Sequence, residues 1–245
     1  MSAMKYTKEY EVRSYECDKH KNLRILTLMN IFQDIADSNA DKMGVGYDYC
    51  VSHNLAWVAA NYHVKILRSP KLREKITINS WPSEERKLAA IRDYEIIDEQ
   101  KEVIVQASTQ WVLIDFNSKR PQLLRAKLPQ YEVLNEKADN FEFSNIALPE
   151  NFDFEKDFVV RFDDIDVNNH VNNAVYPLWL SETVDDEFRN NHTISEIEIS
   201  FKKEIHAGEV VKSKSSRNGL ESIHSIISMT DGREAARAIL KWNKV

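Results

Sequence analysis

Two segments of this 245-residue chain are similar to each other although they lie 148 positions apart. Val12–Asn22 and Val160–His170 share a Val, an Arg and an Asp at equivalent positions. Further along, Trp111 matches Trp242 at an offset of 131, and differences in loop length explain the drift. A repeat of this kind indicates one supersecondary unit that is used twice. The sequence therefore predicts two modules of the same fold.

Each module is expected to run as a strand, a helix and then a series of strands. Apolar residues at i, i+3, i+4 and i+7 predict the first helix, which should end before Gly44. These residues are Leu28, Ile31, Phe32 and Ile35. Short segments rich in β-branched and aromatic residues predict four strands. They are Trp57–Ile66, Lys75–Trp81, Leu88–Ile97 and Val103–Asp115. The second helix is expected at about Asn173–Arg189.

This order of elements fits an α+β fold, a tandem (double) hot-dog, in which two antiparallel sheets each wrap a long central helix. The expected division is an N-terminal module at 1–116, a linker at 117–157 and a C-terminal module at 158–245. The linker carries three of the six prolines, lacks sustained periodicity and should hold only a short helix near residue 130. With 42% hydrophobic residues, the chain can bury a core in each module.

An acid, an amide and an imidazole recur at every second position as Asp166, Asn168 and His170. Such groups can polarise a carbonyl and move a proton, which are the two tasks of acyl-transfer chemistry. Their best partner is Glu204, at the end of a strand-like stretch just before Gly208. On its own this motif is weak evidence for catalysis, because Asn and Asp also cluster in turns and cap helices.

Together the two segments resemble the C-terminal half of the acyl-acyl carrier protein (acyl-ACP) thioesterases, which release fatty acids from their carrier. The resemblance implies catalytic roles for four residues, namely Asp166, Asn168, His170 and Glu204. Plant members often place a Cys directly after the Glu, whereas this chain has Ile205, so no thiol is expected there. His53–Pro70 and Ala107–Asp115 look like strands of the family's first module, and the resemblance extends from about residue 8 to residue 242.

The resemblance implies that a thioester is hydrolysed by the second module while the first holds the substrate. In the first copy Ser69 stands at the position of Glu204, and Asn22 at that of His170. Leu28 and Phe32 are expected to line an acyl tunnel. Free N–H groups near Asn172 and Asn173 should stabilise the oxyanion. Glu204 activates water or attacks directly, and the sequence leaves both routes open.

Two other kinds of function stay open on the sequence. A hot-dog thioesterase acting on acyl-coenzyme A would use similar chemistry but would bind a nucleotide instead of a carrier protein. A non-catalytic acyl-binding protein would keep the tunnel without turnover, and the presence of all four site residues disfavours it. A homodimer is also left open.

Composition narrows the partners and the location. The net charge of −6, from 33 basic and 39 acidic residues, argues against nucleic acid. The longest apolar stretches are far below the ~20 residues of a membrane span, and the N-terminus lacks a signal segment, so a cytoplasmic protein without membrane contact is expected. Only Cys17 and Cys50 are present, and no cofactor or metal is expected.

The acyl carrier protein (ACP) is acidic, so its docking surface on this chain is expected to be basic. Eight candidate residues are Lys65, Arg68, Lys71, Arg73, Lys119, Arg120, Lys202 and Lys203. Two local features require special geometry. Pro177 falls early in the second helix, which is tolerable only in the first turn. Glu204 needs a bulge or strand end near Lys203 to turn inward. The other histidines, including His206, are expected to be structural or on the surface.

Overall fold

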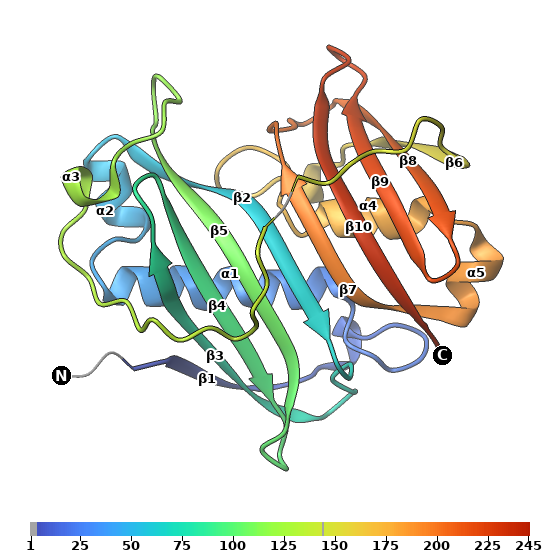
Figure 1. Cartoon of the computed structure of the whole chain (residues 1–245), viewed down its shortest axis with the longest axis horizontal. Helices are drawn as coiled ribbons and strands as arrows, with labels where there is room; N and C mark the ends of the chain where they lie inside the picture. Colours follow the sequence, from blue (N-terminus) through green and yellow to red (C-terminus); the bar gives the residue numbers. More distant parts are fainter. Residues whose placement is uncertain (1–3, 144) are drawn as a thin grey trace. The chain divides into compact units, whose positions relative to one another are not determined.

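The chain, in a computed structural model that describes residues 4–143 and 145–245, divides into two compact units, Met1–Glu142 and Phe143–Val245. We describe each unit by itself (Figure 1). Unit 1 contains β1 (Tyr6–Glu11), α1 (Ile25–Lys42), α2 (Tyr47–Ser52), β2 (Leu55–Ile66), β3 (Lys75–Glu85), β4 (Ala89–Ile97), β5 (Val103–Asp115) and α3 (Leu124–Lys127). A short 3-10 turn at Ser14–Glu16 separates β1 from α1.

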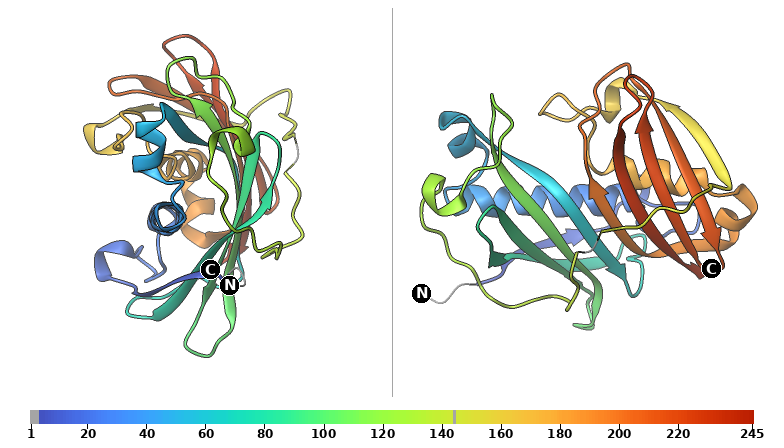
Figure 2. Two further views of the ribbon diagram at one scale, coloured as in Figure 1. Left: turned by 90° about the vertical axis from the view of Figure 1, so that its left-hand side faces the viewer. Right: turned by 45° about the horizontal axis from the view of Figure 1, so that its top comes forward.

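The strands of unit 1 form an antiparallel sheet in the order β1-β3-β4-β5-β2. Figure 2 (left) looks along α1, which lies on one face of this sheet. Leu28, Phe32 and Ile35 are almost fully buried there, as their helical spacing predicts. The ring of Phe32 contacts that of Tyr94 on β4, with 4.7 Å between centroids. The predicted first helix and the four predicted strands of this unit are confirmed, with ends shifted by a few residues.

The opposite face of this sheet is covered by the segment that follows α3. The Trp81 indole N–H donates to the Glu136 carbonyl at 2.7 Å, and the Ala138 N–H donates to the Asp93 carboxylate at 2.8 Å. The short helix expected near residue 130 is α3, a few residues earlier. The three-part division at 116/117 and 157/158 stays a prediction.

Unit 2 repeats this plan with one difference in its helix. It contains β6 (Phe154–Val159), α4 (Val175–Thr183), α5 (Asp186–Asn191), β7 (His192–Phe201), β8 (Val210–Asn218), β9 (Glu221–Ser228) and β10 (Glu234–Lys244). The strand order β6-β8-β9-β10-β7 corresponds strand by strand to that of unit 1. Since the order and the antiparallel pairing recur, the predicted internal repeat is confirmed at the level of topology.

The single helix predicted at about Asn173–Arg189 is wrong in its length. α4 has nine residues and ends where Val184 adopts an extended backbone. Asp185 then caps α5, because its carboxylate accepts the Phe188 N–H at 2.8 Å. Pro177 is the third residue of α4, so its missing N–H falls in the first turn, where no intrahelical bond is lost.

Candidate active site

The motif segment of unit 2 forms a tight turn before α4. The Asp166 N–H donates to the His170 carbonyl at 2.9 Å, and the Asn169 N–H to the Asp166 carbonyl at 3.0 Å. Asn169 adopts the left-handed conformation (φ 65°), which asparagine tolerates well. The Val171 N–H donates to the Ile205 carbonyl at 2.8 Å. This last bond brings the Glu204 segment beside the turn.

Glu204 faces this turn because β7 ends early. The strand stops at Phe201, and the N–H groups of Lys202 and Lys203 both donate to the Ala235 carbonyl, at 2.8 and 3.2 Å. Two consecutive residues opposite one acceptor are typical of a bulge, which breaks the alternation of side chains between faces. The strand end that the sequence required near Lys203 is confirmed.

His170 lies between two carboxylates. Its Nδ1 is 3.7 Å from Asp166 Oδ1, and its Nε2 is 3.8 Å from Glu204 Oε1. The side chain of Asp166 is 10% exposed, that of His170 27% and that of Glu204 33%. These distances exceed those of hydrogen bonds, but catalytic contacts are often loose before substrate binds. The arrangement gives one imidazole access to an acid on each of its nitrogens.

Asn168 is the fourth predicted site residue, and it lies on the exposed side of the turn. Its N–H donates to Asp166 Oδ1 at 2.8 Å, and its amide nitrogen is 3.5 Å from Asp166 Oδ2. The structure therefore brings Asp166, His170 and Glu204 together and places Asn168 at the rim. Its catalytic role stays a prediction.

Two neighbours of the site were not singled out by the sequence. The exposed ring of His206 lies edge-on to His170 with 6.5 Å between centroids, and its Nδ1 is 3.3 Å from the Asn169 carbonyl. Tyr176 is buried in α4, and its hydroxyl donates to the Lys203 carbonyl at 3.3 Å. Burial, with a smaller contribution from the Glu204 carboxylate, raises the pKa of Tyr176 well above its ordinary value. An apolar helical pattern gave no reason to single out this phenol.

The backbone hydrogen bonds before α4 differ in one respect from the prediction for the oxyanion site. The Asn172 N–H already donates to the Asp164 carbonyl at 2.8 Å, and the Asn172 side chain accepts the Ala174 N–H at 2.9 Å. The Asn173 N–H has no hydrogen-bond partner among the described residues. Of the two N–H groups that were expected to be available, only that of Asn173 is.

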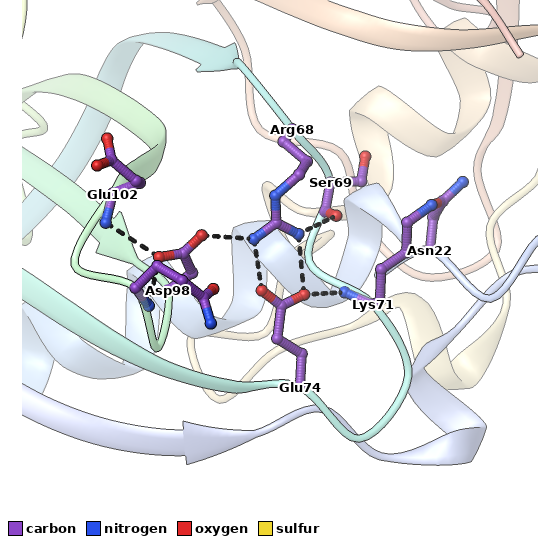
Figure 3. Close-up of polar contacts among 8 residues, drawn as sticks. Asn22, Arg68, Ser69, Lys71, Glu74, Asp98 and Glu102 are labelled. Carbon is purple, nitrogen blue, oxygen red and sulfur yellow. Dashed lines mark hydrogen bonds and ion pairs between the residues drawn. The ribbon is translucent and has the colours of Figure 1, made fainter.

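The equivalent position in unit 1 holds a different set of groups (Figure 3). The Arg68 guanidinium contacts Glu74 at 2.6 Å and Asp98 at 2.9 Å, and the Lys71 ammonium donates to the Asn22 side chain. The bond to Arg68 holds the pKa of the Glu74 carboxyl below its usual range. Ser69 stands where unit 2 has Glu204. Unit 1 therefore has no imidazole at the position of His170 and no carboxylate at the position of Glu204, while His20 stands at the position of Asn168.

Unit 1 contains a cavity of about 380 Å³ between β1, β3 and the first turns of α1. Its aliphatic lining residues are Leu26, Ile31, Ile35 and Ile78, and charged side chains also border it, namely Lys8, Glu16, Arg24 and Asp34. Leu28 and Phe32, which were expected to line a tunnel, are not among the lining residues and belong to the packed core. Within the described residues, no group of three or more His, Cys, Asp and Glu is arranged to hold a metal ion.

Comparison with known proteins identifies the class. The fold matches the solved 12:0-ACP thioesterase of Umbellularia californica with a TM-score of 0.85 and 22% identity, over 100% of this chain and 99% of that one. An acyl-ACP thioesterase of Bacteroides thetaiotaomicron gives a TM-score of 0.81 and 19% identity, over 98% of each chain. At these identities the likeness shows the fold alone, which is of the hot-dog type.

The sequence comparison names the family. The model of the acyl-ACP thioesterase N-terminal domain matches residues 3–128, and that of the C-terminal domain matches residues 149–244. The chain therefore belongs to the acyl-ACP thioesterase family, whose members hydrolyse acyl-ACP thioesters and release the fatty acid. The oleoyl-ACP thioesterase 1 of Arabidopsis thaliana chloroplasts is 23% identical over 98% of this chain.

Curated relatives of this chain are longer than it is. The chain spans 76% of the length of the Arabidopsis enzyme and 62% of the length of an acyl-ACP hydrolase of Cuphea viscosissima. In residues 4–143 and 145–245, no helix has both the length and the apolar composition that a membrane crossing requires.

Proposed function

We propose that unit 2 hydrolyses an acyl-ACP thioester at the His170 site. In the route through water, Glu204 removes a proton from a water molecule, and the water oxygen attacks the thioester carbonyl carbon. The carbon–sulfur bond of the tetrahedral intermediate then breaks, and His170 delivers a proton to the leaving thiolate. In the alternative route, Glu204 attacks the carbonyl carbon directly and water cleaves the resulting anhydride. Asp166 holds the imidazole, and Asn168 orients the water or Glu204.

One observation carries the proposal. His170 and Glu204 lie 34 positions apart in the sequence, yet His170 sits within 4 Å of both Glu204 and Asp166. The other ion pairs of the described residues join a Lys or an Arg to a carboxylate. Here an imidazole lies between two carboxylates, and one of these follows the end of β7. Titratable groups that lie this close to one another are common in sites that carry out acid–base catalysis.

The Asn173 N–H is the proposed donor to the oxyanion. It belongs to the turn that enters α4, where the helix dipole also favours negative charge. Neutralising charge that develops on the carbonyl oxygen is usually the largest single contribution to such reactions. The proposed donor is a backbone group, so its identity does not depend on the Asn173 side chain.

We also propose the finer organisation of the molecule. Each unit is a hot-dog module whose sheet curves round its helix, with boundaries at 1–116, 117–157 and 158–245. Unit 1 holds the acyl chain in its cavity, against the aliphatic side chains of Leu26, Ile31, Ile35 and Ile78. The protein acts in the cytoplasm, without nucleic acid or membrane as a partner.

The direct experiment is a pair of substitutions, Glu204→Ala and His170→Ala. Each should lower kcat/KM for acyl-ACP by two or more orders of magnitude, because each removes a group that moves a proton in the transition state. Glu221→Ala, at an exposed position of unit 2, is the matched control and should leave turnover unchanged. Near wild-type hydrolysis by a folded Glu204→Ala protein would remove the site from the mechanism.

Acyl-coenzyme A is the alternative substrate, and the chemistry at the sulfur is the same for both. Measuring kcat/KM for the two thioesters at equal acyl length separates them. A clear preference for acyl-ACP supports the proposed function. A preference for acyl-coenzyme A would assign the chain to the alternative.

A further inference from the structure

The loop that follows Glu204 repeats the hydrogen bonds of its counterpart in unit 1. The His206 N–H donates to the Glu209 carboxylate at 2.9 Å, and the Glu209 N–H donates to the His206 carbonyl at 3.3 Å. In unit 1, Lys71 and Glu74 make the same two bonds, at 2.7 and 3.0 Å (Figure 3). The equivalent residues lie 135 positions apart in both cases. His206 therefore occupies the position of Lys71.

One bond between this loop and the turn of residues 166–170 differs between the units. In unit 1, the Lys21 carbonyl accepts the Leu72 N–H at 3.0 Å. The equivalent carbonyl in unit 2 is that of Asn169, and among residues 4–143 and 145–245 no main-chain N–H donates to it. Its partner is the imidazole of His206, with 3.3 Å between the carbonyl oxygen and Nδ1. A side chain of unit 2 thus takes the place of a main-chain donor of unit 1.

This bond acts on the backbone from which His170 projects. The Asn169 carbonyl and the His170 N–H belong to one planar peptide unit, so a donor to the carbonyl fixes the orientation of that plane. The His170 imidazole is 3.7 Å from Asp166 and 3.8 Å from Glu204. It must move by about 0.5 Å before either contact becomes a hydrogen bond. Because a misplacement of about 1 Å can lower a rate by about 10²-fold, turnover should respond to the bond at Asn169.

The bond of His206 differs from those of two other histidines that contact a carbonyl. His53 and His192 each place Nδ1 2.8 Å from a carbonyl only four residues earlier, which is a contact within one short segment. His206 reaches across 37 positions to the residue next to the proposed catalytic imidazole. Since a carbonyl oxygen can only accept, Nδ1 of His206 carries a proton, and the neutral and the charged ring can both donate there. The bond therefore does not require His206 to gain or lose a proton.

We propose that His206 is a positioning residue for thioester hydrolysis, whose ring N–H holds the Asn169 carbonyl and thereby orients the turn that carries His170. The inference rests on the proposed function, because His170 is the group through which His206 acts. The two imidazoles are neighbours, edge-on with 6.5 Å between centroids. His206 itself transfers no proton in this scheme.

The test compares two substitutions at position 206. His206→Ala removes the donor and should lower kcat for acyl-ACP about tenfold, the upper range for the loss of one hydrogen bond, with KM nearly unchanged. His206→Asn places an amide N–H close to the position of Nδ1 and should recover most of the lost kcat. The pH profile of kcat should keep its shape in both variants, because His206 donates without titrating. His53→Ala, which removes an exposed histidine with the same kind of bond in unit 1, is the matched control and should leave kcat unchanged.

Three results would overturn the inference. Unchanged kcat in His206→Ala would mean that the turn keeps its geometry without this bond. An equal loss of kcat in His206→Ala and His206→Asn would mean that the imidazole does more than donate one bond, and an altered pH profile would identify proton exchange with the site. A rise in KM alone would mean that His206 contacts the substrate.

Amide hydrogen exchange separates this inference from the proposed function. The Asp166 N–H donates to the His170 carbonyl within the turn. Its exchange, followed by NMR, should be faster in His206→Ala than in the wild type and close to the wild type in His206→Asn. That pattern supports the positioning role even if the wild type hydrolyses no thioester. Hydrolysis of acyl-ACP with the same kcat and the same exchange rates in wild type and both variants sinks the positioning role and leaves the proposed function standing.

Discussion

The catalytic turn of unit 2 and its counterpart in unit 1 have the same backbone and different chemistry. The Asp18 N–H donates to the Asn22 carbonyl at 2.8 Å, as the Asp166 N–H does to the His170 carbonyl at 2.9 Å. Lys21 and Asn169 are both left-handed with φ of 65°. The turn is thus held by its main chain and by one Asp, which means that the remaining side chains were free to diverge.

The two units also use charge differently beside this turn. In unit 1, the Arg68 guanidinium forms ion pairs with both Glu74 and Asp98. In unit 2, hydrogen bonds from Lys203 and Arg233 lower the pKa of the Asp231 carboxyl, whereas Glu204 is left facing His170. Among the described residues, Glu204 thus lies against an imidazole, whereas Glu74 of unit 1 lies against a guanidinium.

The largest expected effect comes from giving unit 2 the residues of unit 1. The double change His170→Asn and Glu204→Ser should lower the rate of hydrolysis by two or more orders of magnitude. The turn keeps its backbone hydrogen bonds but loses both groups that move protons. Circular dichroism and the melting temperature should stay close to those of the wild type. Steady-state hydrolysis of acyl-ACP is the measurement.

The reciprocal exchange is the control for that comparison. Asn22→His with Ser69→Glu in unit 1 of the inactive protein should not restore turnover, because Lys71 and Arg68 lie beside those positions and would pair with a new carboxylate. Recovered hydrolysis would show that the charge pairs of unit 1 do not matter for the division of labour.

A smaller effect is expected from filling the unit 1 cavity. Ile35→Trp should shift preference toward shorter acyl groups, because each methylene that loses its place forfeits about 0.8 kcal/mol of burial, so two or three change relative affinity by about tenfold or more. Leu28→Trp is the matched control in the packed core, where overpacking should lower the melting temperature and the activity on all chain lengths together. A uniform fall for Ile35→Trp would contradict the assignment of the cavity to the acyl chain.

A buried residue in the middle of the strands of each unit predicts a difference in the pH dependence of stability. His224 on β9 pairs with Ala238, and Tyr94 on β4 pairs with Ala107, so the two occupy equivalent positions. Burial lowers the pKa of His224 to about 3. Because the unfolded chain binds a proton near pH 6.5 and the folded one does not, the free energy of unfolding falls as the pH drops from about 6 to 4.

The substitution His224→Gln should remove this part of the pH dependence. Between pH 6 and 4, the wild type should lose up to ~1.4 kcal/mol per pH unit more than the variant. Urea unfolding at several pH values measures this difference. Tyr94→Phe, at the equivalent place in unit 1, should keep the slope of the wild type, and identical slopes for His224→Gln and wild type would refute the interpretation.

The smallest effect is expected for the two thiols. Cys17 corresponds to Ile165 in the catalytic turn, and burial raises its pKa. Burial raises the pKa of Cys50 to about 11. Protonated, buried thiols are poor nucleophiles, so Cys17→Ser with Cys50→Ser should leave turnover unaltered. Loss of hydrolysis in a folded double variant would show that a thiol takes part after all.

The sequence predicted the repeat, the strands and α1 because each rests on local periodicity or on a turn that occurs twice. It also required the strand end before Glu204, from the mismatch between the apolar alternation of β7 and an inward carboxylate. It missed the break after α4, although Asp185 carries an ordinary capping signal, because Leu180, Val184 and Phe188 keep a helical spacing across it. The role of Tyr176 could not be predicted, since its hydroxyl contacts the Lys203 carbonyl, which is distant in sequence. The Asn172 N–H bonds to the Asp164 carbonyl within the same segment, through a turn geometry that the residue types alone do not specify.

The carbonyl of Ala235, which accepts two successive N–H groups, has a consequence for how this family can evolve. Every amino acid carries a carbonyl, so the direction of Glu204 does not depend on the side chain at position 235 beyond its small size in a fully buried place. It does depend on the pairing register of β10 with β7, in which Ala236 lies opposite Phe201. A one-residue insertion or deletion within the paired part of β10 should therefore shift that register and turn the carboxylate away, whereas an exchange of one small residue for another at position 235 should not.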